Sequence, residues 1–168
     1  MDAAVATAGR GIYFEPNPIH KVELSLVMQD SPRYVKLTDS LAASPQIQAA
    51  DMAAIAEAGY QVVINNRPDG EEPNQPAEEA IASAAQAAGM EYHYMPVTAA
   101  SFPGPHFDAM SDLLDDPARP VLAFCRSGTR CANLWVAGSD DIQRESAMQA
   151  ARERGFDLGL VVSYLARL

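Results

Sequence analysis

The chain has 168 residues, a length that suits one domain with a sizeable hydrophobic core. Its formal net charge of −10 argues against nucleic acid and anionic membrane as partners, because both attract basic surfaces. A small anionic substrate must therefore be held by a local positive site that acts against the charge of the whole molecule.

The chain contains two cysteines, Cys125 and Cys131, too few for a disulfide framework or a cysteine zinc site. The histidines at 20, 93 and 106 show no metal-ligand spacing, so we expect no metal. The sequence also implies no organic cofactor. The N-terminus lacks the basic start and apolar segment of a signal peptide. No apolar run approaches the roughly 20 residues that span a membrane. These features predict a protein of the reducing cytoplasm.

Residues 1–33 are interpreted as an N-terminal extension of unknown function that contains a short strand at 22–28. A regular pattern of apolar runs and helical periodicity begins at Tyr34. Strands are expected at 34–37, 41–43, 60–65, 90–97 and 120–124, and helices at 48–59, 77–89, 106–116, 131–138, 139–155 and 156–168.

The alternation of strands and helices predicts βαβ units and a mainly parallel sheet. We therefore expect residues 34–168 to form a three-layer α/β domain, with helices on both faces of the sheet. The loops that follow the carboxyl ends of parallel strands share one edge, which is where such folds bind their ligands.

The stretch VLAFCRSGTRCANLW (121–135) places Cys125 between a buried strand and a helix. In such a loop several backbone N–H groups converge, and the positive end of the helix dipole adds to them. Arg130 at the helix start could clamp a tetrahedral anion through two hydrogen bonds. This environment lowers the pKa of a thiol, so Cys125 is predicted to be a nucleophilic thiolate.

The neighbouring loop residues are expected to shape the anion site. Gly128 permits a positive φ and a close approach of the backbone, and Ser127 and Thr129 offer hydroxyl groups. Arg126 adds a second positive charge within the loop. Cys131 is either a packing residue or a resolving thiol that could form a disulfide with Cys125.

A second candidate segment, NNRPDGEE (65–72), follows another predicted strand and should reach the same edge. Arg67 and Asp69 could contact the substrate or brace the loop, and Asn66 could hydrogen-bond the loop backbone. The alternative is a Pro-Asp-Gly turn with a purely structural role.

The hexapeptide CRSGTR resembles the active loop of rhodanese-type sulfurtransferases. The wider chain resembles the phosphatase-like domain of beta-lactamase-hydrolase-like proteins, once a domain of unknown function. The resemblance extends over about 34–168 and implies a fold similar to the tyrosine and dual-specificity phosphatases. Members of that family also occur with sulfide-oxidising enzymes. The matching stretches are SPQI (44–47), 58–76, 92–98, 121–135 and RGFDL (154–158).

Two departures from the phosphatase pattern favour sulfur transfer as the main hypothesis. Four residues separate Cys125 from Arg130, whereas the phosphatase signature has five between them. The position of the phosphatase general acid falls on 98–100 (Thr-Ala-Ala), and the nearest carboxylate, Asp108, lies in a predicted helix. In this hypothesis Cys125 carries sulfane sulfur as a persulfide.

The alternatives are a phosphatase with a Cys125 phosphocysteine intermediate and a non-catalytic sensor of anions or persulfides. The expected substrate is thiosulfate, a persulfide or a phosphate ester, and a homodimer is left open.

Overall fold

The computed structural model describes residues 32–168, and the strand expected at 22–28 lies outside them. A five-stranded sheet runs in the order β1-β2-β5-β3-β4. β1 pairs antiparallel with β2, and the other three pairings are parallel, as the sequence predicts. The division of the chain at residue 33 stays a prediction. The strands are β1 (Val35–Lys36), β2 (Leu41–Ser44), β3 (Val62–Asn65), β4 (Glu91–Tyr94) and β5 (Val121–Phe124).

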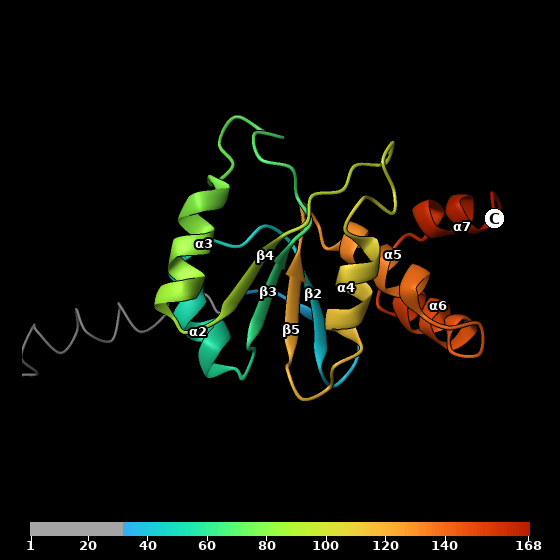
Figure 1. Cartoon of the computed structure of the whole chain (residues 1–168), viewed down its shortest axis with the longest axis horizontal. Helices are drawn as coiled ribbons and strands as arrows, with labels where there is room; N and C mark the ends of the chain where they lie inside the picture. Colours follow the sequence, from blue (N-terminus) through green and yellow to red (C-terminus); the bar gives the residue numbers. More distant parts are fainter. Residues whose placement is uncertain (1–31) are drawn as a thin grey trace, which may run out of the picture. The chain divides into compact units, whose positions relative to one another are not determined.

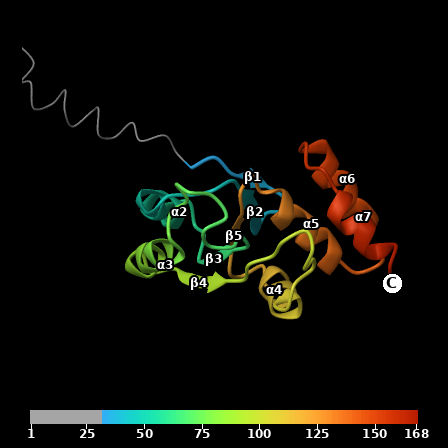
Figure 2. The ribbon, with the colours of Figure 1, turned by 90° about the horizontal axis from the view of Figure 1, so that it is seen from above.

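Helices cover both faces of the sheet (Figure 1). α2 and α3 lie on one face and α4 and α5 on the other, while α6 and α7 pack against the outer side of α5 (Figure 2). This is the expected three-layer arrangement. The helices are η1 (Ala49–Asp51), α2 (Met52–Glu57), α3 (Glu78–Ala87), α4 (Phe107–Leu114), α5 (Thr129–Gly138), α6 (Arg144–Glu153) and α7 (Gly159–Leu165).

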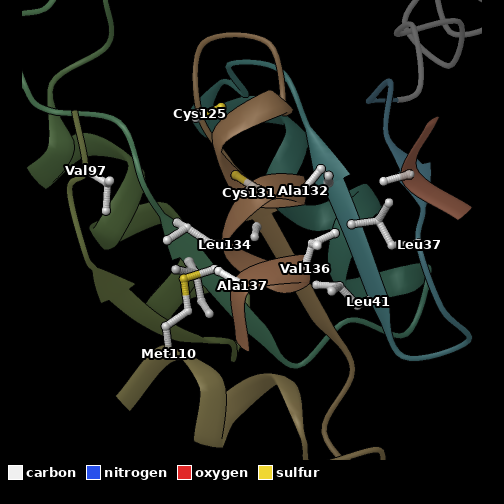
Figure 3. Close-up of a cluster of buried hydrophobic side chains, with 14 of the residues drawn as sticks. Leu37, Leu41, Val97, Met110, Cys125, Cys131, Ala132, Leu134, Val136 and Ala137 are labelled. Atoms are coloured by element: carbon white, nitrogen blue, oxygen red, sulfur yellow. The ribbon is translucent and has the colours of Figure 1, made fainter. Parts of the chain in front are cut away.

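The central strands are buried on both faces because each face carries a layer of helices. Every residue of β2, β3 and β5 is buried. Val63 and Leu122 pack toward α2 and α3, whereas Ile64 and Ala123 belong to the cluster on the opposite face. Figure 3 shows that opposite cluster, in which side chains of α5 meet those of the sheet and α4.

The register of the parallel strands aligns their carboxyl ends. Phe124 at the end of β5 pairs with Ser44 of β2 on one side and with Asn65 of β3 on the other. Residues that follow these three positions therefore emerge at one edge of the sheet. Cys125 is the first residue after β5 at that edge.

Several helix boundaries differ from the prediction, among them the starts of α5, α6 and α7, the last of which begins at Gly159 and not at 156. The helix expected at 139–155 begins only at Arg144, because Asp140 closes a turn by accepting a hydrogen bond from the Gln143 backbone N–H at 2.7 Å. α5 begins at Thr129, two residues earlier than the expected 131, directly after Gly128. Among residues 32–168, no helix is long and apolar enough to cross a membrane.

Candidate active site

The Cys loop, residues 125–130, is fixed to the neighbouring strand β2. The backbone N–H of Cys125 donates to the Ser44 carbonyl at 3.2 Å. Beyond the strand, Pro45 forms an isolated bridge with Ser127. These contacts place the loop at the carboxyl edge of the sheet with its Cys125 side chain almost completely buried.

Gly128 gives the loop its sharp turn. Its φ of 87° is a left-handed conformation that side-chain-bearing residues rarely adopt. A Cβ at this position would meet the Ser44 carbonyl oxygen at 3.4 Å and a Phe156 ring carbon at 3.3 Å. The turn directs the Gly128 N–H toward the Cys125 Sγ at 3.1 Å. A glycine therefore suits this position both for the backbone conformation and for the close packing against Ser44 and Phe156.

The environment of Cys125 lowers the pKa of its thiol from 9.0 to about 5. The largest effect is a hydrogen bond from the Cys131 thiol, and burial acts against it. Backbone N–H groups and the positive charge of Arg130 lower the pKa further. Cys125 is therefore a thiolate at neutral pH, as an attacking nucleophile requires.

Cys131 complements this thiolate. Its side chain is buried in the first turn of α5, beside Cys125 (Figure 3). Burial, and then the neighbouring Cys125, raise its pKa well above the usual value. Cys131 thus keeps its proton, the form in which its thiol can donate to the Cys125 sulfur.

We expect Cys125 to react with iodoacetamide with an apparent pKa of about 5. The alkylation rate should be constant above neutral pH and fall in acid, because only the thiolate attacks. Mass spectrometry of the Cys125 peptide after short exposures at each pH measures this profile. In Cys131→Ala the loss of the donor should move the apparent pKa upward. A rate that still rises above about pH 8, as for an ordinary thiol, would contradict a neutral-pH thiolate.

Arg130, at the start of α5, does not point freely into the loop. Its Nη1 donates to the Val97 carbonyl at 2.8 Å, and its Nη2 pairs with the Glu71 carboxylate at 2.8 Å. The side chain is only 14% exposed, so these contacts are largely shielded from solvent. Arg130 therefore links the Cys loop to two other segments, the one that follows β4 and the loop between β3 and α3.

Arg67 and Arg126 extend this contact into a cluster. Arg67 donates through Nε to Glu71 at 2.8 Å and through Nη2 to Glu72 at 2.5 Å. Glu72 also pairs with Arg126 Nη2 at 2.8 Å. We call these five residues, Arg67, Glu71, Glu72, Arg126 and Arg130, the Arg–Glu cluster.

The electrostatics of the Arg–Glu cluster keep the Glu71 carboxylate charged. Burial alone would raise the pKa of Glu71, but hydrogen bonds from Arg130 and Arg67 hold that pKa below its usual value. Arg67 is 3% exposed, and its Nη1 also donates to the Gln46 side chain at 2.9 Å. Glu71 is thus an acceptor and is unsuited to donating a proton near neutral pH.

The structure brings together some of the predicted site residues and separates others. The Ser127 and Thr129 hydroxyls hydrogen-bond each other at 3.0 Å within the loop. Asn66 was expected to bond the loop backbone, but its buried side chain donates to the Met95 carbonyl at 2.9 Å. Asp69 lies outside the cluster, where its carboxylate accepts from the Glu78 backbone N–H at 3.0 Å at the start of α3.

Sequence reasoning did not single out Glu71 and Glu72, although both lie in the segment NNRPDGEE. The available signal was charge. A loop expected to approach a basic site carried two consecutive acidic residues, which can pair with the arginines there. Their neighbours Arg67 and Asp69 were considered instead, as residues that could contact the substrate or brace the loop.

The place where a phosphatase general acid is expected holds a turn without a carboxylate. The Thr98 backbone N–H donates to the Ser101 hydroxyl at 3.0 Å, and the Ser101 N–H donates back to the Thr98 hydroxyl at 3.1 Å. Asp108 lies in the first turn of α4. Among residues 32–168, no three His, Cys, Asp or Glu side chains gather as a metal site requires.

Two cavities bear on where a substrate could lie. One of about 420 Å³ adjoins the Arg–Glu cluster and is lined by residues that include Arg67, Glu72 and Gln75. A slightly larger one of about 490 Å³ lies around Trp135, near the far end of α5. No residue of the Cys loop lines either cavity, but the smaller one shares Arg67 and Glu72 with the Arg–Glu cluster, which pairs with Arg126 and Arg130 of the loop. The smaller cavity is therefore the better place for the group attached to a reacting anion.

Residues 33–142 match the model of the family described as the phosphatase-like domain of the beta-lactamase hydrolase-like protein. The beta-lactamase hydrolase-like protein of Agrobacterium fabrum is 35% identical over 136 residues, which cover 79% of this chain and 32% of the relative. The protein of the same name from Xylella fastidiosa is 35% identical over 138 residues, 80% of this chain and 32% of the relative. The chain thus spans about a third of the length of these relatives.

Solved structures agree with this match. A Neisseria meningitidis protein, described provisionally as a phosphatase, is 35% identical with a TM-score of 0.62 and covers 74% of this chain and 90% of its own. A Shewanella putrefaciens protein with the same provisional description has 19% identity and a TM-score of 0.59, over 82% of this chain and 85% of that one. Tk-PTP has 18% identity and a TM-score of 0.57, over 84% and 97%.

The last two likenesses show the fold alone, and they confirm the cysteine-phosphatase-like architecture expected from the sequence. Taken with the match over 33–142 and the relatives above 30% identity, they place the Cys loop within a known group of domains. The chain belongs to the family of phosphatase-like domains found in beta-lactamase hydrolase-like proteins.

Proposed function

We propose that this protein is a cysteine-dependent phosphatase that hydrolyses phosphate monoesters through a phosphocysteine on Cys125. The observation that carries the proposal is the Cys125 thiolate, with a pKa of about 5, held in a loop of backbone N–H groups at the start of α5. The phosphatase-like family and the provisional description of the Neisseria meningitidis relative support phosphate chemistry over the sulfur transfer that the sequence favoured.

In the first step the Cys125 sulfur attacks phosphorus, the S–P bond forms, and the bond from phosphorus to the leaving oxygen breaks. The loop N–H groups and the positive end of α5 stabilise the charge on the remaining phosphoryl oxygens. Water then attacks the phosphocysteine, which releases inorganic phosphate and restores the thiolate. Arg130 can join this stabilisation when it turns from Glu71 toward the phosphoryl group.

The charge state of the site determines which leaving groups can depart readily. The turn at 98–101 offers hydroxyls where an acid is expected, and Glu71 stays ionised because its pKa is lowered. The departing oxygen therefore receives no proton from these groups. We infer that aryl phosphates, whose leaving groups are stable as anions, are the better substrates.

We expect kcat/KM to fall by about 10²- to 10⁴-fold from aryl to alkyl phosphates, the range that a general acid normally contributes. Phosphate release from a series of aryl esters and one alkyl ester, at constant pH, measures this dependence. Equal rates for both types would mean that an acid does act. Absence of turnover for every aryl ester would refute the phosphatase proposal.

Sulfur transfer is the second candidate, and the spacing of the loop favours it. Only four residues separate Cys125 from Arg130, and this makes a smaller cradle, better matched to one sulfur atom than to a phosphoryl group. In that reaction the thiolate attacks the outer sulfur of thiosulfate, an S–S bond forms, and sulfite leaves. Intact mass after incubation with thiosulfate tests it: one added sulfur, removable by cyanide and absent in Cys125→Ser, identifies a persulfide carrier.

A further inference from the structure

We propose that Glu71 and Glu72 make the Cys125 site selective for anions that carry a single negative charge. They do so by neutralising the arginines that would otherwise hold a dianion. The inference rests on the proposed function only in placing the substrate anion at the Cys loop. It adds the charge class of the substrate, which neither the fold nor the nucleophile specifies.

The charges of the site cancel locally. In the Arg–Glu cluster three guanidinium groups face two carboxylates, all joined by ion pairs of 2.5 to 2.8 Å. The Cys125 thiolate supplies a third negative charge. The site therefore has no surplus positive charge to attract a dianion, and the molecule as a whole carries −10.

Arg130 is the residue where the competition takes place. One of its terminal nitrogens is engaged by the Val97 carbonyl and the other by Glu71. An anion that takes two hydrogen bonds from Arg130 must displace the Glu71 carboxylate, which then remains a short distance away and repels it. The repulsion energy is proportional to the charge of the incoming anion. A dianion is therefore repelled by Glu71 about twice as strongly as a monoanion in the same place.

Protonation of Glu71 does not relieve this repulsion near neutral pH. Its pKa is lowered by Arg130 and Arg67, against the effect of burial, so the carboxylate stays ionised. Arg67 is fixed by Gln46 as well as by both glutamates, and it keeps Glu71 near Arg130 even when that pair opens. A monoanion can instead bind the loop N–H groups while the cluster stays closed.

This selectivity narrows the substrate class. A phosphate monoester has a second pKa of about 6, so it is singly charged only in mild acid. The thiolate form of Cys125 is already present there, since its pKa is about 5. The site is thus suited to phosphate monoesters that retain one proton, or to other tetrahedral monoanions.

The test compares sulfate with methyl sulfate, two tetrahedral anions of charge −2 and −1 that this chemistry does not turn over. Each is titrated as a protectant of Cys125 against iodoacetamide, at neutral pH and constant ionic strength. In the wild-type protein methyl sulfate should protect at a concentration no higher than sulfate. Glu71→Gln keeps a hydrogen-bond acceptor for Arg130 but removes the negative charge. In this variant the ratio of the protecting concentrations of sulfate and methyl sulfate should fall by about tenfold, in favour of sulfate.

Two further variants complete the design. Glu79→Gln removes the same charge from the exposed first turn of α3 and should leave the preference unchanged. Glu72→Gln leaves the contacts of Arg130 intact and should move the preference in the same direction by a smaller factor. It also provides the comparison if Glu71→Gln fails to fold.

The inference is overturned if wild type prefers sulfate, if Glu71→Gln behaves like Glu79→Gln, or if neither anion protects Cys125. Hydrolysis plays no part in the readout, so the two proposals fail separately. A protein with this anion preference and no activity on aryl phosphates would refute only the phosphatase proposal. Hydrolysis of aryl phosphates without the preference would refute only the charge selectivity.

Discussion

Replacing Cys125 with serine is expected to lower kcat for aryl phosphates by at least about 10⁴-fold, the scale of losing a catalytic nucleophile. The loop that makes a thiolate of Cys125 cannot ionise a serine hydroxyl, whose pKa lies far above that of a thiol. Serine is also smaller, so its oxygen lies further from the phosphorus. Phosphate release under single-turnover conditions, together with a search for the covalent intermediate by intact mass, measures the loss.

Cys131→Ala is the matched control for this substitution. It removes the other buried thiol, and with it the hydrogen bond that has the largest effect on the pKa of Cys125. The nucleophile remains, so activity should persist at high pH. As the pH is lowered, activity should begin to fall at a higher pH than in the wild type, because the pKa of Cys125 is raised. A Cys125→Ser protein that kept more than about a hundredth of wild-type activity would show that another group attacks phosphorus.

The Cys loop could be predicted from the sequence because its parts are neighbours along the chain. The apolar run VLAF predicts a buried strand, and Gly128 followed by an apolar helical pattern marks the turn into α5. Parallel pairing of β5 with β2 and β3 then fixes the edge at which Cys125 emerges. Local sequence therefore decides both the backbone conformation and the place of the nucleophile.

The partners of the charged side chains could not be predicted in this way. Glu71 and Arg130 are 59 residues apart, and their pairing depends on how two loops meet at the sheet edge. Asn66 shows the same difficulty, because its amide could reach several carbonyls and the fold selects that of Met95. Long polar side chains have many conformations of similar energy, and tertiary contacts choose among them.

Arg130→Lys is expected to lower kcat/KM for aryl phosphates by about 10²- to 10³-fold, as for the loss of one donor that stabilises a transition state. The planar guanidinium holds the Val97 carbonyl with one nitrogen and can present the other to a phosphoryl oxygen. A lysine ammonium is a point charge and cannot keep both directions.

Arg126→Lys separates this effect from a simple loss of guanidinium. Arg126 belongs to the same loop, but its side chain is 65% exposed and it pairs with Glu72 at the solvent side. Its replacement should change kcat/KM by no more than a few-fold, since exposed pairs contribute little. If Arg130→Lys lowered kcat/KM by only a few-fold and also reduced the thermal stability, the role of Arg130 would be structural, to join α5 to Val97. A fall in kcat with stability retained would instead show that Arg130 acts on the transition state, after it has exchanged Glu71 for the phosphoryl oxygens.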